Sequence, residues 1–200
     1  MNANRHDVCA LVLAAGSASR FGATKQLAEL DGVPLVTRAT VTAAAVCDNR
    51  VVLVVGHDWQ AVAEAGLPDR GFLVHNDRYA DGLGSSISQG ARSLRHAAGA
   101  VLVLLADQPL VTAEHLRAVV DAWSGAGDEI IATEFDGSSG PPVLFAHECF
   151  DDLANLTGDS GGKHLLSDKR FQTRMIRFDP AAVDIDESED LKRISRSARS

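Results

Sequence analysis

A loop after the first apolar run of the chain combines small residues with two cations. It reads Leu13-Ala14-Ala15-Gly16-Ser17-Ala18-Ser19-Arg20-Phe21-Gly22-Ala23-Thr24-Lys25. Small residues let a backbone come close to a ligand and offer it N–H groups, and glycine permits turns that would strain bulkier residues. Arg20 adds a planar guanidinium suited to phosphate oxygens, and Lys25 adds a compact point charge. The loop therefore predicts a site that neutralises a triphosphate and a pyrophosphate leaving group.

The spacing of this loop differs from two common phosphate-binding patterns. It has neither the GxxxxGK[ST] of a P-loop nor the GxGxxG of a dinucleotide-binding turn. The alternative interpretation is a glycine-rich surface loop with two solvated cations. We favour the ligand site, because cations and glycines converge directly after the first apolar run.

A carboxylate follows a later apolar run. Val101–Leu105 is succeeded by Ala106, Asp107, Gln108 and Pro109. A carboxylate at the carboxyl end of a buried strand is well placed to hold Mg2+ between phosphate oxygens. The alternative is a turn or capping aspartate before a proline. Asp107 belongs to the same predicted rim as the first loop, which favours the metal interpretation.

Apolar runs of strand length recur along the chain. Val8–Leu13, Val51–Val55 and Val101–Leu105 do not alternate apolar with polar residues, so both faces of each strand should be covered. Shorter strand candidates are Phe72–His75, Glu129–Thr133, Pro142–Phe145 and Arg174–Phe178.

Segments with helical spacing separate these runs. Thr112 is a plausible N-cap for a helix whose apolar stripe is Leu116, Val119, Val120 and Trp123. Further helices are expected around Ile87–Leu94 and Val36–Val46. Strands that alternate with helices predict an α/β fold of three layers with a mostly parallel sheet.

The character of the sequence changes after about Gly125. Gly137–Pro142 has turn chemistry between two short strands, which predicts a small antiparallel excursion on the substrate side. Lys192–Ser200 is polar and basic and is expected to be frayed. We expect a single domain over residues 1–200, with a nucleotide-binding part at about 7–111, a substrate-side part at about 112–191 and a basic tail at 192–200.

Composition excludes several classes of protein. The 200 residues carry 19 Lys+Arg against 27 Asp+Glu, a net charge of −8, which argues against a general nucleic-acid binder. No apolar stretch has the length of a membrane span, and the amino-terminal stretch lacks a secretory signal. The three scattered cysteines fit free thiols in a reducing compartment. We therefore expect a cytoplasmic protein without nucleic-acid or membrane partners.

Two motifs carry a resemblance. LVLAAGSASRFGATKQL, followed by LLADQPLV, resembles the nucleotidyltransferase superfamily, which makes activated sugars and cofactors from nucleoside triphosphates. Within it, His75–Ser86, Gly140–Phe145 and Thr157–Lys163 are similar to the molybdenum cofactor cytidylyltransferases. The resemblance covers Val8 to about Leu191 and implies a three-layer, Rossmann-like nucleotidyltransferase fold.

The resemblance also implies roles for individual residues. Arg20 and Lys25 would hold the triphosphate, with Lys25 stabilising the charge that develops on the α-phosphate, and Asp107 would be the main Mg2+ ligand. The remaining nucleotide-binding positions would be Leu13, Ala14, Ala15, Gly16, Gly82, Ser85 and Ser86. The acceptor substrate would be bound by Gly140, Pro141, Pro142 and Lys163.

The sequence departs from the family pattern at two places. Val183–Leu191 resembles the closing segment of the family, where Asp186 would be the second metal ligand; the alternative is a solvated acid before a helix. Glu187-Ser188 stands where family members often have Thr-Pro, and Ser188 is a reasonable N-cap. Ser160 and Lys163 occupy positions that are often arginine, so Lys163 is left to meet the terminal phosphate of a pterin.

The expected reaction is CMP transfer from CTP to the terminal phosphate of molybdopterin or molybdenum cofactor, with Mg2+ or Mn2+ as cofactor and a molybdenum hydroxylase as recipient of the product. One alternative is a guanylyltransferase or sugar-phosphate nucleotidyltransferase of the same fold. Another is a non-catalytic carrier or insertion chaperone for the cofactor. The four charged residues Arg20, Lys25, Asp107 and Asp186 argue against a carrier, which has no use for a pyrophosphate site. A structural or nucleic-acid-binding protein is the remotest alternative.

Overall fold

A seven-stranded sheet forms the centre of the protein. The computed structural model describes residues 7–17 and 21–197. The strand order is β5-β4-β1-β6-β8-β7-β9. The strands are β1 (Val8–Ala14), β4 (Val51–Val55), β5 (Phe72–His75), β6 (Ala100–Leu105), β7 (Glu129–Phe135), β8 (Ser138–Ala146) and β9 (Gln172–Arg177). A separate two-stranded sheet pairs β2 (Glu29–Leu30) with β3 (Val33–Pro34).

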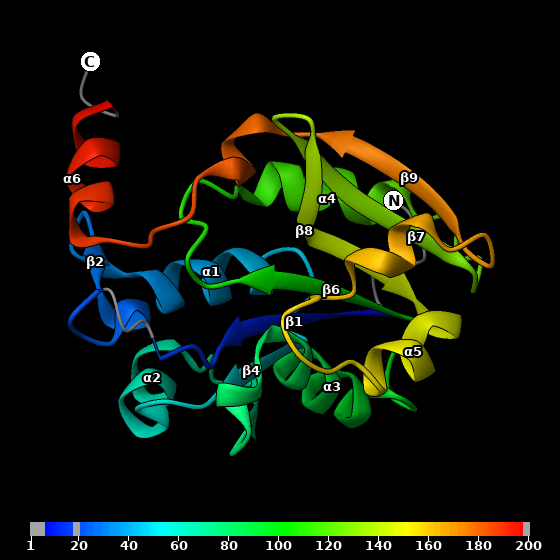
Figure 1. Cartoon of the computed structure of the whole chain (residues 1–200), viewed down its shortest axis with the longest axis horizontal. Helices are drawn as coiled ribbons and strands as arrows, with labels where there is room; N and C mark the ends of the chain where they lie inside the picture. The colour runs from blue at the N-terminus through cyan, green and yellow to red at the C-terminus, as the bar shows by residue number, and fades with distance from the viewer. Residues whose placement is uncertain (1–6, 18–20, 198–200) are drawn as a thin grey trace.

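The described part of the chain contains six α-helices, five of which pack beside the large sheet while the last lies beside β2 (Figure 1). They are α1 (Leu35–Ala44), α2 (Trp59–Gly66), α3 (Leu83–Leu94), α4 (Ala113–Ala122), α5 (Phe150–Ala154) and α6 (Ser188–Ser197). Thr112 caps α4 as predicted, since its side-chain oxygen accepts a hydrogen bond from His115 N at 3.2 Å. Among residues 7–17 and 21–197, no helix has both the length and the apolarity needed to cross a bilayer.

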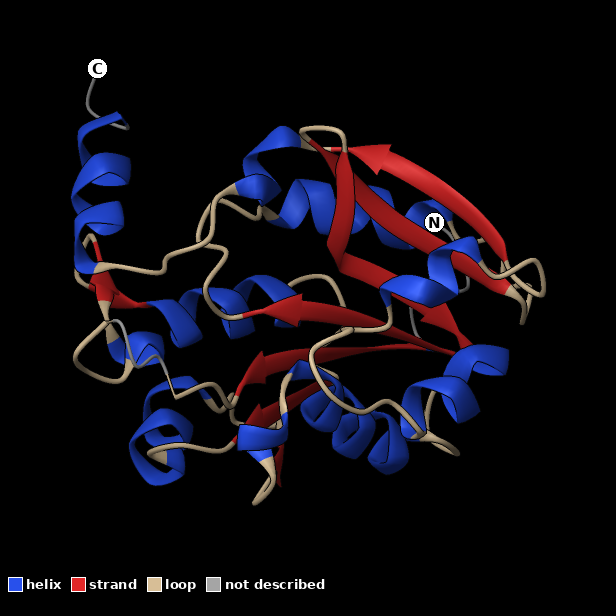
Figure 2. Cartoon of the chain, in the orientation of Figure 1, coloured by secondary structure: helices blue, strands red, loops and turns tan. Residues whose placement is uncertain are grey.

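Strand β1 shows how the sheet is covered on both faces. All seven of its residues are buried. Its even-numbered residues pack in one cluster with side chains of α1, α2 and α4, and its odd-numbered residues pack in a second cluster with side chains of α3 and α5. Figure 2 shows the resulting three layers, with the red sheet between blue helices. The predicted three-layer α/β fold is confirmed.

The strands that end at the predicted site are parallel. β1 pairs in parallel with β4 and β6, and β4 pairs in parallel with β5. Their carboxyl ends therefore meet at one edge of the sheet, on the left in Figure 1. β8 is antiparallel to both β6 and β7, whereas β9 is parallel to β7. The predicted mostly parallel sheet with a small antiparallel excursion is thus also confirmed.

The turn of this excursion is shorter than the sequence suggested. Asp136 and Gly137 have φ values of 46° and 70°, and they make a two-residue connection between β7 and β8. Two residues with positive φ give a turn whose twist matches that of paired strands. Ser138–Pro141, which the sequence predicts as part of the turn before a strand at Pro142–Phe145, instead belongs to β8.

The carboxyl-terminal segment is the second correction. Lys192 and the residues after it up to 197 continue helix α6 rather than fraying, while residues 198–200 lie outside the described part of the chain. Leu191 and Ile194 pack against a small cluster formed by Leu30, Leu35 and Ile185. Two apolar side chains three positions apart in a basic segment therefore suffice to dock the helix.

The start of α6 also differs in detail from the expectation. Ser188 is the first helical residue rather than the N-cap. Asp190 supplies the acceptor instead, because its Oδ2 takes hydrogen bonds from the backbone N–H groups of Asp186 at 3.1 Å and Glu187 at 2.9 Å. This arrangement fixes the backbone at Asp186.

Candidate active site

Lys25 lies between two carboxylates, at the side of the large sheet where the carboxyl ends of β1, β4 and β6 meet. Its Nζ donates to Asp107 Oδ2 at 2.6 Å and to Asp186 Oδ1 at 3.2 Å. The Lys25 side chain is 12% exposed, against 22% for Asp107 and 67% for Asp186. Three residues predicted separately from the sequence are thus brought together in one charged cluster.

Backbone contacts hold the two carboxylates in this position. Asp107 follows β6, and its carbonyl accepts a hydrogen bond from Ile185 N at 2.9 Å. Gln108 is buried, and its Nε2 donates to Ala181 O at 2.8 Å. The fully buried Ile185 anchors the segment from its other side. The segment that carries Asp186 is therefore fastened directly to the end of β6.

Lys25 is positioned by the short helical turn η2 (Lys25–Leu27). Ala28 N donates to Lys25 O at 3.0 Å, and Leu27 N donates to Thr24 O at 2.9 Å. The buried Gln26 donates from Nε2 to Gly16 O at 2.8 Å, which ties the turn to the loop after β1. The backbone at Lys25 is consequently fixed, while its flexible side chain reaches the carboxylates.

The cluster shifts the pKa values of its members. Burial alone would lower the pKa of Lys25, but the charge and hydrogen bond of Asp107, with those of Asp186, outweigh it and raise the pKa above its ordinary value. Burial, together with the nearby charges of Asp107 and Asp186, raises the pKa of Asp184 to about 6. Asp184 is therefore a third carboxyl group in the field of this site.

The donor set fits a hard divalent cation. Asp107 Oδ1 is buried and has no hydrogen-bond partner among the described residues, so it retains lone pairs for a ligand. Mg2+ is usually held by one or two carboxylates together with substrate phosphates, and Mn2+ accepts the same oxygen ligands. Residues 7–17 and 21–197 contain no group of three or more His, Cys, Asp or Glu arranged for a metal. Asp107 and Asp186 thus suit a metal that arrives with phosphate oxygens.

The loop after β1 lies beside this cluster. Leu13, Ala14 and Ala15 are buried, and Gly16 is exposed. Ala15 O accepts a hydrogen bond from His57 N at 3.3 Å, which joins the loop to the end of β4. Arg20, expected to hold the triphosphate, lies outside the described residues.

The predicted nucleoside segment opens helix α3. Ser86 is buried and accepts a hydrogen bond from Asn76 Nδ2 at 3.0 Å, and Ser85 accepts one from the same nitrogen at 2.9 Å. Asn76 Oδ1 accepts from Arg78 N at 3.0 Å. Both serine hydroxyls therefore help to order the first turn of α3, and Gly82, with φ of 98°, makes the turn into it.

This turn packs directly against the segment Thr157–Lys163. Gly84 N donates to Gly158 O at 2.7 Å. A Cβ at Gly84 would lie 2.8 Å from the carbonyl oxygens of both Thr157 and Gly158, so only glycine allows this approach. Two motifs that the sequence separates by more than 70 residues are thus in contact.

A cavity of about 130 Å3 lies next to this contact. Gly140, Pro141 and Lys163 line it, together with Asp159 and several apolar side chains. Lys163 Nζ donates to Ser138 Oγ at 3.2 Å. Pro142 is buried and does not line the cavity, and its carbonyl accepts a hydrogen bond from Thr133 Oγ1 at 2.7 Å. The structure therefore gathers three of the four predicted acceptor residues around one cavity.

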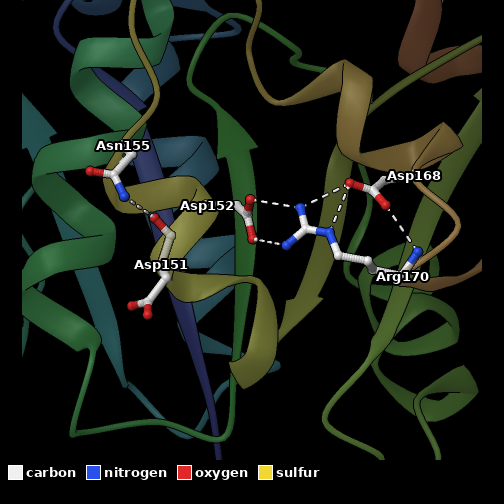
Figure 3. A network of polar contacts seen from close by, with 5 residues as sticks. All are labelled: Asp151, Asp152, Asn155, Asp168 and Arg170. Carbon is white, nitrogen blue, oxygen red and sulfur yellow. Dashed lines mark hydrogen bonds and ion pairs between the residues drawn. The ribbon is translucent and has the colours of Figure 1, made fainter.

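An arginine forms ion pairs at both ends of the segment between α5 and β9, which carries Lys163. Arg170 pairs with Asp152 of α5 and with Asp168, in both cases through Nη2 at 2.8 Å (Figure 3). Asn155 Nδ2 donates to the backbone carbonyl of Asp151 at 2.8 Å in the same region. Arg170 thus links the end of α5 to the start of β9 across the loop between them.

Comparison with known proteins shows to which family the chain belongs. The sequence pattern of the MobA-like NTP transferase domain matches residues 10–174. The purine catabolism protein PucB of Bacillus subtilis is 30% identical over 162 residues, which cover 77% of this chain and 78% of PucB. The chain belongs to the MobA-like NTP transferase family. It is a nucleotidyltransferase.

Further relatives of this transferase support the same fold. The bifunctional protein GlmU of Geobacter metallireducens is 31% identical over 140 residues, 67% of this chain but 29% of GlmU. The crystal structure of Rv0371c from Mycobacterium tuberculosis superposes with a TM-score of 0.81 at 25% identity, covering 95% of this chain and 98% of that one. A second structure of Rv0371c, in complex with manganese, has a TM-score of 0.78, also at 25% identity, covering 96% of this chain and 99% of that one.

Sequence reasoning missed three polar residues at the site of this transferase: Asp184, Gln108 and Asn76. The signal for Asp184 was present in the alternation Asp184-Ile185-Asp186, because a buried residue between two acids places both acids on the opposite face. Gln108 and Asn76 lie within the quoted motifs, but neither the charge nor the spacing of these residues distinguished them. Gln108 bonds to the distant Ala181, and Asn76 bonds to Ser85 across a local turn, and only the structure shows these contacts.

Proposed function

We propose that this transferase moves CMP from CTP to the terminal phosphate of molybdopterin or molybdenum cofactor and releases pyrophosphate. The observation that carries the proposal is the cluster of Lys25, Asp107 and Asp186 at the carboxyl edge of the sheet. The choice of CTP and of a pterin acceptor rests on the resemblance of the segments at His75–Ser86, Gly140–Phe145 and Thr157–Lys163 to the cytidylyl branch.

The reaction is an in-line displacement at phosphorus. An oxygen of the acceptor phosphate forms a bond to the α-phosphorus of CTP, and the bond from that phosphorus to the α,β-bridging oxygen breaks. The bonding pair leaves with pyrophosphate. A phosphate monoester is already an anionic nucleophile near neutral pH, so no residue has to remove a proton.

Charge neutralisation is therefore the main task of the chain. Lys25 supplies an ammonium group from a fixed backbone and can follow the charge that grows on the α-phosphate. Asp107 and Asp186 would hold the divalent cation, which when bound neutralises phosphate oxygens and orients them. The loop from Leu13 to Gly16 would offer backbone groups to the base and the phosphates.

The acceptor would lie in the cavity lined by Gly140, Pro141 and Lys163. Lys163 places a cation there for the terminal phosphate, and the apolar walls suit a planar ring. Orientation of two polyanions in one cleft supplies the rest of the rate enhancement. A molybdenum hydroxylase is the proposed recipient of the product.

The decisive experiment measures pyrophosphate release with CTP, GTP, UTP and ATP, each with and without molybdenum cofactor. We expect release with CTP that depends on the cofactor. Faster release with GTP than with CTP would replace the proposal by guanylyl transfer. In a parallel assay, a sugar phosphate takes the place of the cofactor, and release there would replace the proposed acceptor. Absence of release with every triphosphate, with the cofactor bound, would favour a carrier.

A further inference from the structure

The carboxylates that suit a metal already have a cation between them. Lys25 Nζ contacts Asp107 Oδ2 at 2.6 Å and Asp186 Oδ1 at 3.2 Å. Asp107 Oδ1 has no partner among the described residues and could accept a metal, but an ion held by both carboxylates would stand beside the ammonium group that Asp107 Oδ2 and Asp186 Oδ1 already bind. Lys25 and a metal therefore compete for the negative charge of this pair.

The competition is unequal in the absence of phosphate. A bare divalent cation would have to stand next to the ammonium group, or break the short charge-assisted hydrogen bond that holds this group on Asp107. Lys25 is 12% exposed, so solvent screens this repulsion poorly. Asp107 and Asp186 alone would also make a weak site for Mg2+ or Mn2+, because neither metal is usually held without phosphate or water oxygens.

A triphosphate removes both obstacles. Its oxygens offer Lys25 a new partner, and they complete the coordination of the metal. The backbone of Lys25 is held by hydrogen bonds from Ala28 N and by the Gln26 contact to Gly16. Only the four-carbon side chain has to swing from the carboxylates toward the phosphates.

We propose that Lys25 is the resident cation of the Asp107–Asp186 pair, and that a divalent metal reaches these carboxylates only together with a nucleoside triphosphate that draws the ammonium away. This inference rests on the proposed nucleotide chemistry but adds an order of binding to it. Lys25 thereby has two positions in one cycle, one on the carboxylates and one on the phosphate.

The experiment measures Mn2+ binding by electron paramagnetic resonance, which reports free Mn2+ without any turnover. Wild type, Lys25→Met and Lys163→Met are titrated with Mn2+ alone. They are then titrated with Mn2+ and the non-hydrolysable α,β-methylene analogue of CTP. Lys163→Met is the matched control, because it removes the same charge from the acceptor cavity. Lys25→Met/Asp107→Asn tests whether any gain in binding uses this site.

We expect Lys25→Met to bind Mn2+ alone at least about tenfold more tightly than wild type, since a charge-assisted hydrogen bond no longer has to be broken. Lys163→Met should match wild type, and the double variant should lose the gain. In wild type, the analogue should tighten Mn2+ binding by a larger factor than in Lys25→Met.

Equal affinity of wild type and Lys25→Met for Mn2+ alone, within twofold, would overturn the inference. So would a gain that Lys163→Met shares or that the double variant keeps. If Lys25→Met does not fold, Lys25→Gln provides the same comparison. Failure of the proposed function is read separately, as absence of pyrophosphate release by wild type with any triphosphate.

Discussion

Acidification should weaken the fold through one buried histidine of helix α4. His115 of α4 is 4% exposed and stacks on Phe178, with ring centroids 4.2 Å apart. Its Nε2 lies 2.8 Å from Thr133 Oγ1, whose own proton goes to Pro142 O. Nε2 must therefore be the donor, and Nδ1 is the nitrogen that an added proton would occupy.

The magnitude follows from the pKa. Burial lowers the pKa of His115 from 6.5 to about 4. The native state then binds fewer protons than the unfolded state between these values, so stability rises with pH. The stability that depends on a neutral His115 is fully present above pH 6.5 and is lost as the pH falls to about 4. At 1.36 kcal/mol per unit, the loss over this window is about 3 kcal/mol.

Urea unfolding of wild type and His115→Gln at half-unit steps from pH 7.5 to pH 4 provides the measurement. The variant should be less stable at pH 7.5, but its stability should fall less steeply between pH 6.5 and 4. An NMR titration of the imidazole in the native state checks the pKa directly. Parallel stability profiles for the two proteins, or an imidazole that titrates near 6.5, would refute the reasoning.

Four further outcomes are expected. Lys25→Ala or Asp107→Ala should leave the circular dichroism spectrum unchanged and lower turnover at least about a hundredfold, and near-normal turnover would remove the role assigned to that residue. Lys163→Ala should raise the KM for the phosphate acceptor while the KM for the nucleotide stays within about twofold; a reversed pattern would relocate the acceptor. Gly84→Ala forces α3 and the loop at Thr157 apart and should cost about 1–3 kcal/mol of stability in urea unfolding, with a raised KM for both substrates, whereas a neutral effect would contradict the close packing. Removal of divalent metal with EDTA should abolish pyrophosphate release, and Mg2+ or Mn2+ should restore it; activity that persists in EDTA would exclude the metal site at Asp107.

The layers of the fold were predictable because the burial of a strand on both faces produces an uninterrupted apolar run in the sequence. Val8–Leu13 lacks alternation, which indicates a strand covered on both faces, and β1 indeed divides its side chains between two helix layers. The antiparallel excursion was also predictable, from glycine and proline between two short apolar runs. The extent of its turn was not, since strand pairing with β7 extends β8 through residues with turn propensity.

The carboxyl-terminal helix shows the opposite case. Its composition is polar and basic, and local propensity alone suggests fraying. Leu191 and Ile194 become partly buried because Leu30, Leu35 and Ile185 are brought beneath them from elsewhere in the chain. No local pattern records such a contact, so the prediction was wrong for the residues up to 197.

The sequence by itself determined the chemical types at the site. Lys25, Asp107 and Asp186 each stand at the end of a recognisable apolar run or family motif, where side chains meet at one edge of a parallel sheet. Only the tertiary structure decided that the three touch. Asp107 is 82 residues and Asp186 is 161 residues from Lys25 along the chain. Their contact depends on the hydrogen bond from Ile185 to Asp107 and on the hydrogen bond from Gln26 to Gly16. Residue types and the periodicity of apolar residues can be read from the sequence. The ion-pair partner of a charged residue depends on which distant segments the core packs together.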